Sequence, residues 1–191
     1  MTLKWLVASF AAGFLLASCA PTHNLNIPTH EVQTFELVDK RPQGDKDTSY
    51  GRLDGKWAIS KFGDGSFTPD RLALLKSLLD DAYGQELKGK RIEVTRLRTL
   101  VYLYPRNNLG EMINEAHGLQ IYPGIPDPRK DWWIFEIAAS VDGKTYARNI
   151  AKETPETKFC ASCYQDVRSM VVLEALNEFV DGFGKNAGLK K

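Results

Sequence analysis

The chain has 191 residues, of which 43% are hydrophobic and 26% are charged. These fractions are typical of globular proteins and argue against a fibrous or wholly disordered chain, and the length fits one compact domain. The 25 Lys and Arg residues against 24 Asp and Glu leave a formal net charge of +1. Without an excess of basic residues, the sequence predicts no nucleic-acid partner.

The first predicted element is an export signal. One basic residue, Lys4, precedes an apolar run from Trp5 to Leu16. The run has the proportions of a secretory signal and is shorter than the about 20 apolar residues that cross a membrane as a helix. It ends in Leu16-Ala17-Ser18-Cys19. An ordinary secretory signal that happens to contain a cysteine is the alternative interpretation.

The residues Leu16-Ala17-Ser18-Cys19 resemble the lipobox of bacterial lipoproteins. The resemblance implies that residues 1–18 are removed as a signal peptide, and that Cys19 carries an S-diacylglycerol group and an N-acyl chain. Two or more such chains anchor a protein stably in a bilayer. The implied location is the cell envelope. In a Gram-negative organism, Ala20 in place of Asp after the cysteine favours the periplasmic face of the outer membrane.

The segment after the anchor is predicted to be a tether. Residues 20–30 (APTHNLNIPTH) are polar and contain two prolines, a composition typical of linkers. The sequence therefore predicts a lipidated N-terminus and tether over residues 19–30, and a single domain over residues 31–191.

The domain is predicted to begin with two strands and a helix. In residues 32–38, Phe35 and Leu37 alternate with the polar Thr34 and Glu36, and residues 56–62 form a second strand-like run. The helix that follows is predicted to have Thr68 as its N-cap, Pro69 as its first residue and Gly84 as its stop.

The second half of the domain is predicted to be mainly β-structure. Residues 90–104 favour a strand, but their apolar positions change parity near Thr95-Arg96, which predicts a β-bulge. Residues 133–141 alternate cleanly. Asp142-Gly143 then predicts a tight hairpin turn, which returns the chain as residues 144–150.

A closing helix with a capping box, Ser162 and Gln165, completes the order β-β-α-β-β-β-α. This order predicts an α+β fold: a mixed or antiparallel sheet of about five strands with two main helices on one face.

Together with lipidation, the order resembles the YajG-type lipoproteins and the auxiliary lipoproteins of envelope ABC transporters. The shared features are Asp39-Lys40-Arg41-Pro42 after the first strand, the helix from Pro69, the Asp142-Gly143 hairpin and the closing helix. The resemblance is architectural and implies no activity.

Cys160-Ala161-Ser162-Cys163 is the sharpest local motif in the domain. In an oxidising compartment, Cys160 and Cys163 are predicted to form a structural disulfide. Thiol exchange at a helix N-terminus is an alternative, as are free thiols or an intermolecular bond. Tyr164 stands where haem attachment needs His, and two thiolates are too few for a structural zinc site.

Two other patterns predict no site. Residues 63–68 (GDGSFT) lie between a strand and a helix, where backbone amides can hold phosphate. They lack the third glycine and the lysine of known phosphate-binding motifs, so we expect a turn and no nucleotide. Glu111, Glu115 and His117 do not share one helix face, and no serine has a catalytic setting. The sequence predicts no metal, no cofactor and no enzyme.

Residues 102–133 form a long connection rich in tyrosine, tryptophan and proline, a kind of segment that is often functional. Adjacent residues of a strand point to opposite faces, so we expect one of the two neighbouring tryptophans to be exposed, unless the helices and this loop cover both. An exposed ring suits a protein interface or stacking on a sugar. The candidate partner-binding residues are Tyr104, Tyr122, Trp132, Trp133 and Arg129.

The sequence as a whole predicts a lipid-anchored, non-enzymatic envelope protein that binds or adapts a protein partner. Two alternatives stay open. One is periplasmic thiol exchange through Cys160 and Cys163, and the other is binding of cell-wall glycan or lipid through residues 102–133.

Overall fold

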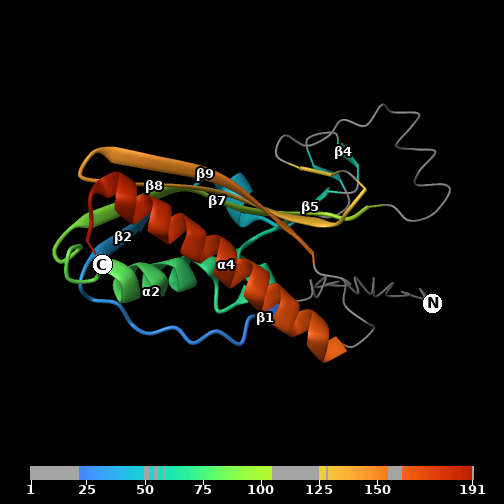
Figure 1. The fold of residues 1–191 in the computed structure, drawn as a ribbon, viewed down its shortest axis with the longest axis horizontal. Coiled ribbons are helices and arrows are strands. Elements are labelled where there is room, and N and C mark those ends of the chain that lie inside the picture. The colour runs from blue at the N-terminus through green and yellow to red at the C-terminus, as the bar shows by residue number, and fades with distance from the viewer. Residues whose placement is uncertain are drawn as a thin grey trace, which may run out of the picture.

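The structure is a computed structural model that describes residues 22–49, 52–53, 56–57, 59–104, 125–127, 129–154 and 161–190. These residues form a five-stranded mixed sheet, two long helices and two small strand pairs (Figure 1). The predicted α+β class, with a sheet of five strands and two main helices, is confirmed.

The central strand of the sheet is β7 (Arg91–Tyr102). On one side it pairs antiparallel with β8 (Trp132–Val141), which in turn pairs antiparallel with β9 (Lys144–Glu153). On its other side β7 pairs with two shorter strands in succession. Its beginning pairs parallel with β2 (Glu36–Asp39), and its end pairs antiparallel with β5 (Ile59–Phe62). The single parallel pair makes the sheet mixed.

The predicted bulge in β7 is confirmed, because the register against β8 shifts between Val94 and Arg96. Before the shift the even-numbered residues of β7 face the helices, and after it the odd-numbered residues do. Ile92 and Val94 lie in the main core before it, and Leu97 and Val101 lie in the same core after it. One extra residue thus keeps a single face of a twelve-residue strand apolar.

The predicted hairpin is also confirmed. Asp142 and Gly143 join β8 to β9 with φ angles of +51° and +77°, left-handed values that suit these two residue types. The strand predicted over residues 56–62 divides in two. Its first part is β4 (Lys56–Trp57), which pairs with β3 (Arg52–Leu53), and its second part is β5.

The helix α2 (Arg71–Tyr83) begins slightly later than predicted. Asp70, not Thr68, is its N-cap, and the Asp70 carboxylate accepts hydrogen bonds from the amides of Leu72 and Ala73 at 2.9 and 3.0 Å. Thr68 is unavailable as a cap because it lies in the short strand β6 (residues 67–68). The helix ends at Gly84, as predicted.

The second long helix, α4 (Ala161–Ala187), begins one residue before the predicted capping residue Ser162. It packs against α2 on the same face of the sheet (Figure 1). A Cβ atom at Gly184 would lie 2.2 Å from Cζ of Tyr83, so the glycine allows the two helices to approach closely.

The residues at the start of the described chain form part of the fold. We call residues 22–35 the strap. Within it, β1 (His23–Asn24) pairs parallel with β6 (Phe67–Thr68) and contacts α4. Figure 1 shows the strap running along α2 before the chain enters β2. The Lys76 ammonium of α2 donates to the carbonyl of Val32 at 2.8 Å.

Of the free tether predicted over residues 19–30, the structure describes residues 22–30 and corrects the prediction there. Leu25 is completely buried, and Val32 and Phe35 are also buried in the main core. The backbone amide of Leu25 donates to the carbonyl of Thr68 at 2.7 Å. Residues 22–30 therefore belong to the folded body and are not a linker.

Apolar side chains pack on both faces of the sheet. The main core lies between the sheet, the strap and the two long helices. A smaller apolar cluster lies on the opposite face, near the end of β7. We call it the second cluster, and it consists of Ile59, Leu100, Tyr102, Ile125, Trp132 and Ile134.

Candidate functional site

Several predicted site residues lie outside the described residues. Cys19, Cys160 and Tyr122 are among them. The backbone of Cys163 lies in the first turn of α4, but its side chain is outside the description. Lipidation of Cys19 and a Cys160–Cys163 disulfide therefore stay predictions.

The two neighbouring tryptophans point to opposite faces of the sheet, as expected, but neither is exposed. Trp133 is 4% exposed and lies in the main core, where its ring stacks on Phe62 and Phe135. Trp132 is 8% exposed in the second cluster, and its indole nitrogen donates to the carbonyl of Asp127 at 2.7 Å. Of the two alternatives, the one in which both rings are covered is confirmed, because each face carries its own apolar cluster at this point.

The other two described candidates, Tyr104 and Arg129, lie where β7 ends and β8 begins. We call residues 102–104 and 129–132 the β7–β8 end. The Asp131 carboxylate accepts from the Tyr104 amide at 2.7 Å. The Arg129 side chain is 80% exposed, and its guanidinium pairs with the Asp127 carboxylate at 3.2 Å. Hydrogen bonds from Arg129 lower the pKa of Asp127. Arg129 thus extends into solvent while it stays paired with Asp127.

The strap begins close to this end of the sheet. The His23 ring lies 5.2 Å from the Phe62 ring and 5.7 Å from the Phe67 ring, and Phe62 in turn stacks on Trp133 at 5.7 Å. Arg168 of α4 lies 2.8 Å from Nδ1 of His23. Burial, together with the nearby guanidinium, lowers the pKa of His23 to about 4. The ring is therefore neutral at pH 7, and Nδ1 accepts a hydrogen bond from Arg168.

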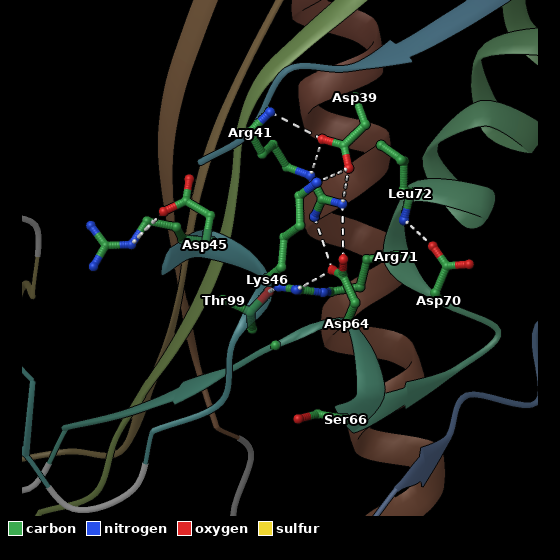
Figure 2. A network of polar contacts seen from close by, with 12 residues as sticks. Asp39, Arg41, Asp45, Lys46, Asp64, Ser66, Asp70, Arg71, Leu72 and Thr99 are labelled. Carbon is green, nitrogen blue, oxygen red and sulfur yellow. Dashed lines mark hydrogen bonds and ion pairs between the residues drawn. The ribbon is translucent and has the colours of Figure 1, made fainter. Parts of the chain in front are cut away.

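Two buried arginines form a network of ion pairs beside the start of α2 (Figure 2). Arg41 makes paired hydrogen bonds to the Asp39 carboxylate at 2.8 and 3.0 Å and to the Asp64 carboxylate at 2.9 Å each. Arg71 donates to Asp64 at 3.1 Å and to the Thr99 hydroxyl at 2.6 Å. Asp64 therefore serves both guanidinium groups.

The electrostatics of this network indicate a structural role. Hydrogen bonds from Arg41 hold the pKa of Asp39 well below its usual range. Burial lowers the pKa of Arg71 to about 10, although Asp64 opposes that shift. Each cation faces a carboxylate supplied by the same network, so the contacts join the end of β2, the turn η1 (Asp64–Ser66), α2 and β7.

The network also decides the interpretation of the Gly63-Asp64-Gly65 segment. The segment leads into the predicted turn, η1, and the Asp64 carboxylate is directed at Arg41 and Arg71. A Cβ atom at Gly63 would lie 2.1 Å from the carbonyl oxygen of Lys46. Gly63 is thus needed for close backbone packing, which accounts for it without a phosphate ligand.

A second charged cluster lies on the opposite face of the sheet. Arg98 of β7 lies 3.1 Å from the Glu136 carboxylate and 3.5 Å from the carboxylate of Asp45 in α1 (Gln43–Lys46). Burial raises the pKa of Asp45, and Arg98 opposes that shift. This cluster fixes the short helix α1 against β7 in the same way that the first network fixes α2.

Across the described ranges, no group of three or more His, Cys, Asp or Glu residues is arranged to hold a metal ion. None of the described helices combines the length and the apolar character needed to cross a membrane.

Comparison of the chain with protein-family models, curated proteins and solved structures finds no match. The resemblance to lipoproteins therefore stays a prediction from the sequence.

Proposed function

We propose that the protein is a non-enzymatic envelope lipoprotein, anchored through acyl chains on Cys19, whose folded body binds a protein partner. The observation that carries the proposal is the lipobox Leu16-Ala17-Ser18-Cys19, which ends an apolar run of signal-peptide length. Proximity of the anchor to the body supports it, because the strap begins three residues after Cys19.

The charged groups of the body also support a binding role. Arg41 and Arg71 are directed at Asp39 and Asp64, and Arg98 is directed at two carboxylates of its own. Perturbed ionisable groups can mark reaction centres, but these groups neutralise one another and join secondary structure elements. Such an arrangement suits a rigid scaffold that presents a surface.

Replacement of Cys19 by Ala is expected to move the protein out of the membrane fraction, because the acyl chains have no other proposed attachment. Mass spectrometry of the parent should find an N-terminal Cys19 that carries acyl chains. Cys163→Ala is the matched control and should leave membrane partitioning unchanged. An intact, unmodified Met1 start in the parent would contradict the anchor, as would equal partitioning of the Cys19→Ala protein.

The partner is tested separately, by chemical cross-linking in native membranes followed by mass spectrometry. We expect the parent protein to be recovered in a complex with a defined envelope protein. The soluble Cys19→Ala protein should yield much less of that complex, because membrane anchoring raises the effective concentration of two tethered proteins. Recovery of monomer alone from the parent would count against an adaptor role.

A further inference from the structure

We propose that the β7–β8 end of the body lies against the lipid headgroups of the membrane that holds the anchor. The inference rests on the proposed acylation of Cys19 and goes beyond it, because it assigns one surface of the body to the bilayer. Four observations lead to it: the length of free chain, the rigidity of its attachment, the place of that attachment and the chemistry of the surface around it.

The chain between the anchor and the body is short. The Thr22 hydroxyl donates to the carbonyl of Gly65 at 3.4 Å, and His23 pairs with Phe67 in the small parallel sheet. Thr22 is three residues after Cys19, a separation of at most about 11 Å when fully extended. A free tether over residues 19–30 could reach about 40 Å. Docking of the strap thus holds the start of the body beside the bilayer.

The attachment point is also rigid. Leu25 is completely buried, and its amide is hydrogen-bonded to the carbonyl of Thr68. His23 is 7% exposed and contacts Arg168 of α4 through its ring. A body held by such buried contacts so close to its anchor can present only a limited part of its surface to the membrane.

The attachment point lies at the same end of the sheet as the β7–β8 end. The His23 ring contacts Phe62, and Phe62 stacks on Trp133. Trp133 pairs with Val101, which is two residues before Leu103. A short series of contacts therefore connects the start of the strap to the place where β7 ends.

The opposite end of the sheet lies far from this point. β8 runs from Trp133 to Val141 before the Asp142-Gly143 turn, a distance of about 26 Å at 3.3 Å per residue. Figure 1 shows the β8–β9 turn and the C-terminus together at one end of the molecule, and β5 near the other end. An anchor three residues from the start of the strap therefore constrains the distance of this end from the bilayer and leaves the turn about 26 Å further along the sheet.

The side chains of the β7–β8 end suit a headgroup surface. Leu103 is 54% exposed, and the side chains of Arg129 and Lys130 are 80% and 50% exposed. Arg129 pairs with Asp127 and Lys130 pairs with Glu153, while the Asp131 carboxylate of the same end accepts a hydrogen bond from the Tyr104 amide. Exposed pairs of this kind are worth less than about 1 kcal/mol, so lipid phosphates can replace the carboxylates. An apolar side chain beside basic residues is typical of the water–lipid interface.

The test places a photocrosslinking residue, p-benzoylphenylalanine, at position 103 of the acylated protein in phosphatidylethanolamine–phosphatidylglycerol vesicles. The matched control carries the same residue in place of Thr145, which is exposed near the far turn. We expect position 103 to form about fivefold more lipid adducts than position 145, because the anchor raises the local lipid concentration at one end only. Intact mass measured first establishes whether Cys19 is acylated, so a failed anchor is distinguished from a wrong orientation.

A second variant tests the short connection itself. Insertion of a flexible Gly-Ser segment of about 20 residues between Cys19 and Thr22 should lower lipid adducts at position 103 by about fivefold, since the body can then turn away. Equal adducts at positions 103 and 145 in acylated protein would overturn the proposal. The proposal would also be overturned if position 103 formed crosslinks to a protein, and not to lipid, in native membranes.

Discussion

Replacement of Asp64 by Asn is expected to lower the free energy of unfolding by about 3 to 5 kcal/mol, because it leaves the buried Arg71 without its carboxylate partner and Arg41 with Asp39 alone. The side chains of Arg41 and Arg71 are only 2% and 1% exposed. Asn preserves the size of the side chain but removes its charge. Urea unfolding at pH 7 of the parent and the variant measures the difference.

Asp81→Asn is the matched control for this substitution. The Asp81 side chain is 66% exposed, and its carboxylate lies 3.9 Å from Nδ1 of His30, so the change should cost less than about 1 kcal/mol. Addition of Arg71→Met to the Asp64→Asn protein should recover part of the loss, because one unpaired cation is then absent. Equal destabilisation by the two Asp→Asn changes would show that the network is not a stabilising unit.

Acidification from pH 7.5 to pH 4.5 is expected to cost about 2.5 kcal/mol of stability through His23 alone. Its pKa is about 4 in the folded protein, against 6.5 for an unperturbed histidine. The unfolded chain therefore takes up a proton between pH 6.5 and pH 4, and the folded chain does not. The stability linked to the neutral ring is fully present above pH 6.5 and falls as the pH drops towards 4.

The histidine effect is isolated by measuring unfolding free energies across that pH range. His23→Gln should remove most of the decline, whatever it does to stability at pH 7.5. His30→Gln is the control, since the His30 side chain is 44% exposed beside Asp80, and the decline should persist in that protein. A decline that vanishes with His30→Gln and survives in His23→Gln would refute the assignment.

The parts of the fold that local patterns control were predictable from the sequence. The bulge near Thr95 follows from a change of parity within one strand, and the hairpin follows from Asp142-Gly143, which tolerate positive φ. The α2 cap was misplaced by two residues, because Thr68 and Asp70 are both good caps and Thr68 is used in a strand pair. Local propensity could not show that competition.

The strap and the ion-pair network depend on partners distant in sequence. Residues 20–30 look like a linker by composition, yet Leu25 is buried by elements from the rest of the chain. Arg41 and Asp64 are 23 residues apart and meet only when β2 and η1 are in place. Acidic and basic residues at the ends of apolar runs were the available signal, but the sequence did not indicate how they pair.

The burial of both tryptophans also depends on residues that are distant in sequence. The alternation at Trp132 and Trp133 correctly predicts opposite faces. It cannot show that Ile59 and Ile125 cover the face opposite the helices. The second cluster brings together residues from separate segments, so exposure at this point was a tertiary property that periodicity did not reveal.

Because the strap contacts α4, the fold can be completed only after α4 has been synthesised. Arg168 bonds to His23, which precedes it by 145 residues, and Leu25 shares a core with Phe179 of α4. A nascent chain without α4 cannot close that core. Under the export that we propose, this dependence would delay stable folding until α4 has also been translocated.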